Sequence, residues 1–227
     1  MSVVVLALDA ADLHHAESFG CEHILLDNHT GMTSLAHTFD YPHTGEVWPS
    51  IATGLHPAEH GVTGQGEWDS AILTQLSRVA HRLAVSGEVR KQIGGLINEY
   101  SGQQWQLNLV DEPTFLDGEH RAVHNWPGVH RNDVLQYLWQ LFQQAKDDKL
   151  STETFRREAY TEAASKFGWL KAAMDYDIEV AAVHIHLLDV LGHLYPNDRE
   201  RYLEVYDAVD AMVAEIRNLL GEDDELL

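Results

Sequence analysis

Apolar residues recur along the chain in two patterns, as short continuous runs and as longer stretches with helical spacing. A continuous run occupies residues 3–8, as expected of a strand buried on both faces of a sheet, and residues 178–188 predict another strand. Helical spacing predicts helices at about 132–145 and 152–174, and a last helix that begins with a capping box at residues 197–200. Strands that alternate with helices indicate an α/β fold with a mostly parallel sheet flanked by helices.

Weaker patterns predict the remaining elements. A further helix is expected around residues 70–83 and a short strand at 105–110. The segment 29–66 is rich in Gly, Thr, His and Pro and predicts a long loop with one short helix, and 113–128 predicts a second loop. No internal repeat or linker divides the sequence, so we expect residues 1–227 to form a single domain.

The charge of the chain limits the classes of molecule to which it can bind. Asp and Glu number 36 against 15 Lys and Arg, which gives a formal net charge of -21. This charge repels phosphate backbones and anionic lipids, and argues against binding to duplex nucleic acid or to a membrane. Cys21 is the single cysteine, and we expect a cytoplasmic protein. An acidic, lysine-poor surface suits a halophilic protein, although an ordinary acidic protein is the alternative.

Carboxylates follow three apolar runs, at Asp9, Asp27 and Asp189. The carboxyl ends of parallel strands meet at one edge of a sheet, where binding sites lie, and Asp9 and Asp189 therefore hint at a common site. Taken singly, Asp9 and Asp27 are more often turn residues. Asp189 and His193 flank a glycine four residues apart, and this spacing lets a carboxylate and an imidazole converge on one metal ion.

Histidines offer two further motifs. His184 and His186 alternate on one predicted strand and face the same side, so they could bind zinc, but a core position is the favoured interpretation. Residues 56–60 match His-x-x-Glu-His, the inverted metallopeptidase motif. A proline after the first histidine and a glycine after the second prevent the sustained helix that this chemistry needs, and we reject the peptidase interpretation.

The segment Thr-Gly-Glu-Val-Trp-Pro-Ser-Ile-Ala-Thr-Gly, residues 44–54, carries the most information. A threonine at a helix N-terminus lies among free amides at the positive end of the helix dipole, which favours an anion such as phosphate. A metal ion on its oxygen would lower the hydroxyl pKa and make it a nucleophile. Thr44 could equally be an N-cap, and Ser50 and Thr53 are rival hydroxyls.

In this order the segments resemble the alkaline phosphatase superfamily, in particular its type I phosphodiesterase/nucleotide pyrophosphatase branch. LALDA resembles the first metal-binding strand, TGEVWPSIATGLHPAEHGV the nucleophile segment, and DVLGH the Asp-x-x-Gly-His motif. The resemblance implies a phosphoester hydrolase with Thr44 as nucleophile and a small-molecule substrate. It also implies two divalent ions, zinc or alternatively manganese, with Asp9 and Thr44 at one ion and Asp189 and His193 at the other.

Two departures from the family pattern qualify this resemblance. Nucleotide pyrophosphatases place an asparagine three residues after the nucleophile, where this chain has Val47. The family's Ser-Asp-His-Gly motif and a later histidine are also missing, so we expect an alkaline-phosphatase-like domain that is C-terminally incomplete. An exposed sheet edge would then invite homo-oligomer formation. The alternative function is a non-catalytic remnant that binds ions or partners without turnover.

Overall fold

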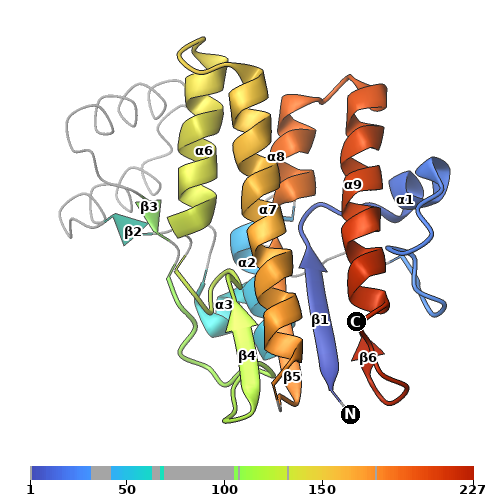
Figure 1. Cartoon of the computed structure of the whole chain (residues 1–227). Coiled ribbons are helices and arrows are strands. Elements are labelled where there is room, and N and C mark those ends of the chain that lie inside the picture. Colours follow the sequence, from blue (N-terminus) through green and yellow to red (C-terminus); the bar gives the residue numbers. More distant parts are fainter. Residues whose placement is uncertain are drawn as a thin grey trace.

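A computed structural model describes residues 2–31, 42–62, 67–68, 105–106, 108–131, 133–176 and 178–227. Four parallel strands form one sheet in the order β4-β5-β1-β6 (Figure 1). Their bounds are β1 Val3–Leu8, β4 Arg121–His124, β5 Val180–Ile185 and β6 Glu225–Leu226. A separate antiparallel pair joins β2 (Glu67–Trp68) to β3 (Trp105–Gln106). The described helices are α1 (Leu13–Phe19), α2 (Thr44–Thr53), α3 (Pro57–His60), α6 (Asp133–Lys146), α7 (Thr152–Met174), α8 (Leu187–Leu194) and α9 (Arg199–Arg217).

This architecture confirms the predicted α/β class with a parallel sheet between helices. The expected strand at residues 3–8 is β1, and the helices expected at 132–145 and 152–174 are α6 and α7. Ser151 begins α7 as its N-cap, because its side chain accepts a hydrogen bond from the backbone N–H of Thr154. The helix expected around 70–83 lies outside the described residues.

The run at residues 178–188 is not one strand, and this expectation was wrong. β5 ends at Ile185, and α8 begins at Leu187, so Asp189 lies in the first turn of a helix. Strand and helix are both buried here, and no glycine or proline marks the change between them. The cap of α9 is also shifted by one residue, because Asp198 rather than Asn197 accepts the hydrogen bond from Arg201 N–H.

Short elements in the two predicted loops were partly missed. β4 lies within the segment expected to be a loop at 113–128, and both α2 and α3 lie within 29–66, where one short helix was expected. The strand expected at 105–110 is shorter, since β3 covers Trp105–Gln106 and residues 108–110 are not in a strand. Asp27 is exposed and follows no strand, so it takes no part in the edge formed by β1 and β5.

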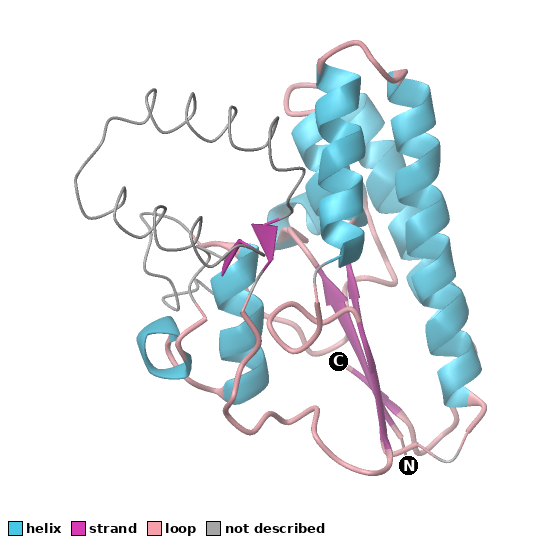
Figure 2. Ribbon diagram, turned by 90° about the vertical axis from the view of Figure 1, so that its left-hand side faces the viewer, coloured by secondary structure: helices cyan, strands magenta, loops and turns pink. Residues whose placement is uncertain are grey.

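The two faces of the sheet are covered by different elements. On one face, Val4 and Val183 pack with residues of α6, α7, α8 and α9 in the larger core. On the other face, Ala7 and Ala182 pack with Trp126 and with Ala52 of α2. Figure 2 shows the sheet between α2 on one side and the long helices on the other. The alternation of side chains along each strand therefore divides the core into two layers.

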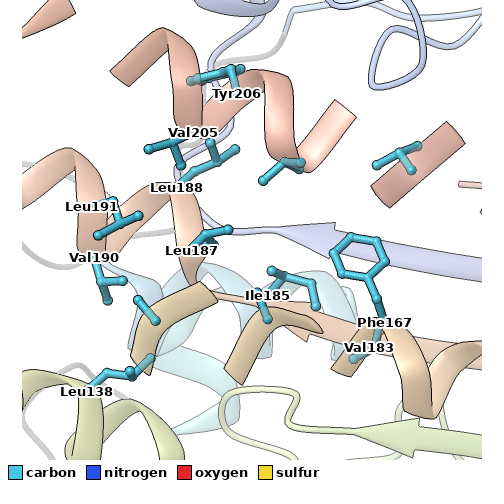
Figure 3. Close-up of a cluster of buried hydrophobic side chains, with 14 of the residues drawn as sticks. Leu138, Phe167, Val183, Ile185, Leu187, Leu188, Val190, Leu191, Val205 and Tyr206 are labelled. Carbon is cyan, nitrogen blue, oxygen red and sulfur yellow. The ribbon is translucent and has the colours of Figure 1, made fainter. Parts of the chain in front are cut away.

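Packing, rather than capping, holds α8 in place. Its N-cap residue His186 makes no side-chain capping bond. The helix instead buries four aliphatic side chains beside β5, α7 and α9 (Figure 3), namely Leu187, Leu188, Val190 and Leu191. Each such side chain contributes roughly 1.5–3 kcal/mol on burial, against about 1 kcal/mol for a good N-cap. Asp189 and His193, the two polar residues of the Asp-x-x-Gly-His motif, therefore lie on a helix that is held in place by its buried aliphatic side chains.

The position of α2 is fixed by contacts with the loop that follows β4. Trp126 is buried, and its Nε1–H donates to the backbone oxygen of Trp48 over 3.0 Å. Gly128 has φ +76°, and a Cβ at this position would clash with Cγ of Pro49 in α2. Glycine is thus required at this position both by the backbone conformation and by the close approach of α2.

Gly128→Ala is expected to lower the free energy of unfolding by about 2–4 kcal/mol, because it adds a clash with a proline ring to the cost of a positive φ. Gly20→Ala is the matched control, since Gly20 has φ +74° and nothing within 4 Å of a built Cβ. This control should lose only about 1 kcal/mol. Urea unfolding measures the free energy of unfolding of both variants. Equal losses in the two would show that α2 makes no close steric contact with Gly128.

Candidate metal and nucleophile site

The candidate site lies where β1 and β5 end, at the carboxyl edge of the sheet. Leu8 pairs with Ile185, and the next backbone N–H, that of Asp9, donates to the Ile185 oxygen over 2.9 Å. This pairing places the Asp9 carboxylate beside the end of β5. The residue is 6% exposed, and a carboxylate buried to this degree needs polar partners.

Asp9 is held by two residues from the first turns of α2. Thr44 Oγ1 lies 3.1 Å from Oδ2 and 3.4 Å from Oδ1 of the carboxylate and donates to it. Trp48 Nε1–H donates to Oδ1 over 3.1 Å. Thr44 and Trp48 are four residues apart and therefore lie on the same side of the helix. The structure thus brings together two residues that the sequence analysis singled out, Asp9 and Thr44.

His184 and His186 also lie beside this carboxylate. Their ring centroids are 4.3 Å apart, as expected if they face the same way. His186 Nδ1 makes a long hydrogen bond of 3.4 Å to Asp9 Oδ2, and His184 Nε2 lies 3.8 Å from the same oxygen. Within the described part of the chain, these three residues are the group of ligand types close enough to share a metal ion, with all ligand atoms within 4.8 Å of one another.

Both imidazoles are held in the neutral form. They are almost completely buried, as the favoured core interpretation predicted, and burial lowers the pKa of each ring well below its ordinary value. The neighbouring His186 adds to the shift in the pKa of His184, and the charge of Lys166 lowers both. A neutral imidazole keeps a free lone pair, which is the form that binds a metal. A carboxylate beside neutral imidazoles fits a divalent cation of the zinc or manganese class.

Asp189 and His193 face each other along α8. Asp189 Oδ1 lies 3.4 Å from His193 Nε2, and the histidine side chain is half exposed. Burial, and in second place the negative charge of Asp9, raise the pKa of Asp189 to about 7. The effect of the Asp9 charge on Asp189 indicates that both motifs serve one region of the molecule.

Asp189→Asn is expected to raise the stability of the metal-free protein at about pH 8 by about 2 kcal/mol. Each unit of pKa shift corresponds to about 1.4 kcal/mol, and the partial exposure of the side chain roughly halves the total. Because the folded pKa is the higher one, this penalty grows as pH rises from about 4 to 7 and is constant above. Urea unfolding should therefore show a smaller gain at about pH 5, and a gain independent of pH would contradict the assignment.

The rival hydroxyls of α2 point elsewhere. Ser50 Oγ lies 2.9 Å from His60 Nε2, and His60 Nδ1 accepts the backbone N–H of Val62. The neutral ring therefore carries its proton on Nε2 and donates it to Ser50, which leaves no base to activate that serine. Thr53 Oγ1 donates to the Pro49 backbone oxygen over 2.8 Å. Neither hydroxyl forms a hydrogen bond with Asp9, in contrast to Thr44.

The His-x-x-Glu-His segment has a structural role, in agreement with the rejection of a peptidase. α3 lasts a single turn, and His56 is its N-cap, where the side chain accepts the backbone N–H of Ala58. His60 is buried against Ser50 at the other end of the turn. The two imidazoles are therefore engaged in separate local hydrogen bonds.

An α/β sheet with a threonine, a carboxylate and buried imidazoles at its carboxyl edge defines a class of protein suited to metal-assisted chemistry on an anion. The family model for type I phosphodiesterase / nucleotide pyrophosphatase matches residues 23–226, and the chain belongs to this family of phosphoester hydrolases, within the alkaline phosphatase superfamily. Neither the curated proteins nor the solved structures gave a match. Across the described residues, no helix is both long enough and apolar enough to cross a membrane.

Proposed function

We propose that this chain is a metal-dependent phosphoester hydrolase of the phosphodiesterase or phosphatase type, with Thr44 as its nucleophile. The observation that carries the proposal is the hydrogen bond of 3.1 Å from Thr44 Oγ1 to the buried carboxylate of Asp9. The hydroxyl is attached to the first residue of α2, a helix of 10 residues, where the helix dipole favours a bound phosphate. The family to which the chain belongs acts on small-molecule phosphoesters, which fits this arrangement.

Asp9 and Thr44 would hold one divalent ion, and Asp189 and His193 a second one, as the family resemblance implies. Zinc is the expected metal and manganese the alternative, because both accept carboxylate and imidazole ligands. Bound cations supply the positive charge that polarises the phosphoryl oxygens and lowers the pKa of the threonine hydroxyl. That charge also offsets the repulsion between an anionic substrate and a protein of net charge -21.

The residues then account for both halves of the reaction. Thr44 Oγ attacks phosphorus and gives up its proton, while the bond from phosphorus to the leaving alcohol oxygen breaks and that oxygen takes up the proton. The alcohol leaves, and Thr44 carries the phosphoryl group. A water molecule next attacks phosphorus, the bond to Oγ breaks, and a proton of that water passes to Oγ. The sum of the two steps is hydrolysis of one phosphoester bond.

Removal of divalent metals is expected to abolish hydrolysis of bis(p-nitrophenyl) phosphate and p-nitrophenyl phosphate, with a fall of at least about a hundredfold. Addition of zinc or manganese to the chelated protein should restore the rate. The release of nitrophenolate measures both effects. Metal-loaded, folded protein that cleaves neither the diester nor the monoester would instead favour the alternative, an acidic domain that binds ions without turnover.

A further inference from the structure

The family's metal motifs leave His184 and His186 without a role, although both border Asp9. We propose that Asp9 Oδ2, His184 Nε2 and His186 Nδ1 together bind one zinc-class divalent ion, with the hydroxyl of Thr44 beside it. The inference deepens the proposed function, since Asp9 and Thr44 belong to the same site. It assigns the first ion to two imidazoles from the end of β5, which are not part of the Asp-x-x-Gly-His motif.

The spacing of the three ligand atoms fits an ion better than it fits direct hydrogen bonds. The separations from Asp9 Oδ2 are 3.4 Å to His186 Nδ1 and 3.8 Å to His184 Nε2. A good N–H···O hydrogen bond is shorter, at about 2.7–3.2 Å. Ligands at about 2.0–2.2 Å from a tetrahedral zinc ion lie roughly 3.3–3.6 Å from one another. The observed spacing is thus close to that of ligands arranged around a metal.

His184 supplies the second, independent observation. Its side chain is completely buried, and neither ring nitrogen has a hydrogen-bond partner. A buried polar group without a partner costs about 1–3 kcal/mol, so the position would be unfavourable for a residue of the core alone. The ring is packed against Trp48, with ring centroids 4.6 Å apart in an edge-to-face contact. One of the two unpartnered nitrogens, Nε2, lies 3.8 Å from Asp9 Oδ2.

Neighbouring groups hold two of these ligands in orientation. Trp48 Nε1–H donates to Asp9 Oδ1, the oxygen that does not approach the histidines most closely. Oδ2 is therefore the oxygen turned toward His184 and His186. Asn125, which has φ +59°, donates from Nδ2 to the His184 backbone oxygen over 3.1 Å. Hydrogen bonds to ligands of this kind orient them before a metal binds.

The charges around the group also suit a dication. Asp9 is the carboxylate at the centre, and Lys166 is the buried cation whose charge acts on both histidines. Lys166 Nζ lies 2.6 Å from Glu162 Oε1 on the same helix, and this ion pair offsets much of the lysine charge. Two imidazole nitrogens and one carboxylate oxygen select zinc or cobalt over magnesium or calcium, which prefer oxygen ligands.

Cobalt(II) is the probe for this site, because its visible absorption bands report nitrogen and oxygen ligands directly. The full-length protein, freed of metal by a chelator, should bind Co²⁺ and show a visible spectrum. Added Zn²⁺ should displace the Co²⁺ and remove that spectrum. His184→Asn and His186→Asn should each weaken Co²⁺ binding by at least about a hundredfold and lose the tetrahedral band. His60→Asn is the matched control, since His60 is also buried but is bonded to Ser50, and its Co²⁺ spectrum should be unchanged.

Circular dichroism and urea unfolding identify any variant that does not fold. If a variant does not fold, the test uses the wild-type protein instead. The NMR resonances of its histidine ring nitrogens are followed during a titration with Zn²⁺. Large shifts confined to exposed rings would overturn the proposal, as would Co²⁺ binding that is unaffected in folded His184→Asn and His186→Asn. Because Thr44→Ala keeps the carboxylate and both imidazoles, it should still bind Co²⁺ but lose hydrolysis. Failure of the metal site and failure of the proposed function are thus distinguishable.

Discussion

Thr44→Ala should reduce kcat for phosphoester hydrolysis by at least about a thousandfold, because it removes the oxygen proposed to attack phosphorus. The hydroxyl is bonded to Asp9, and the methyl side chain of alanine leaves the backbone of α2 unchanged. The N-cap of this helix is His43, whose Nδ1 accepts the Gly45 N–H, so the start of the helix does not depend on Thr44. Initial rates with a nitrophenyl diester at saturating zinc measure the effect.

Thr53→Ala is the control for this experiment. Thr53 ends the same helix, and its hydroxyl donates to the Pro49 backbone oxygen. We expect the rate of Thr53→Ala to stay within about twofold of wild type, as is usual for a residue that touches no reacting atom. Thr44→Ser should keep a measurable part of the activity because it keeps the oxygen. Equal rates of hydrolysis for Thr44→Ala and wild type would show that Thr44 is not the nucleophile.

Asp9→Asn is expected to have the second largest effect, with a loss of at least about a thousandfold in kcat/KM and of zinc binding at the site. The carboxylate is contacted by Thr44, Trp48 and His186, all from groups that can donate a hydrogen. Asparagine has the same shape but no charge, and its NH₂ group would face one of these donors. The variant therefore loses the charged metal ligand and weakens the acceptor of the hydrogen bond from Thr44.

Asp12→Asn is the matched control for Asp9→Asn. Asp12 is the N-cap of α1 and accepts the backbone N–H of His15. Asparagine is an equally good N-cap, so the variant should keep its stability, zinc affinity and hydrolysis. Competition with a chromophoric chelator measures the zinc affinity of both proteins. Unchanged zinc binding in Asp9→Asn would contradict the place of Asp9 at the centre of the site.

Much of the fold could be predicted because its helices are long and periodic. α6 and α7 show apolar residues at helical spacing, α7 also has an N-cap at Ser151, and β1 is a continuous apolar run. The boundary between β5 and α8 could not be predicted, since both elements are buried and no Gly or Pro separates Ile185 from Leu187. β4 was missed because it is four residues long and its side chains are half buried, so it lacks a strong apolar pattern.

Part of the candidate site could be predicted, because some of its residues lie in recognisable local sequence patterns. Asp9 and Thr44 stand out in the sequence because one follows a buried strand and the other begins a recognisable segment, and the structure places them in contact. The position of Asp9 beside His184 and His186 depends on the parallel register of β1 with β5, which no local pattern contains. The alternation of the two histidines was the available signal, but a chain with 15 histidines produces such pairs by chance.

Trapping of the covalent intermediate tests the central claim most directly. The zinc-loaded protein is mixed with a nitrophenyl phosphoester, quenched in acid during turnover, digested and analysed by mass spectrometry. The account predicts one phosphoryl group on the peptide that contains Thr44, assigned to that residue by fragmentation and missing from Thr44→Ala. Turnover that continues in wild type with no phosphorylated Thr44 at any quench time, and at the same rate in Thr44→Ala, would contradict it.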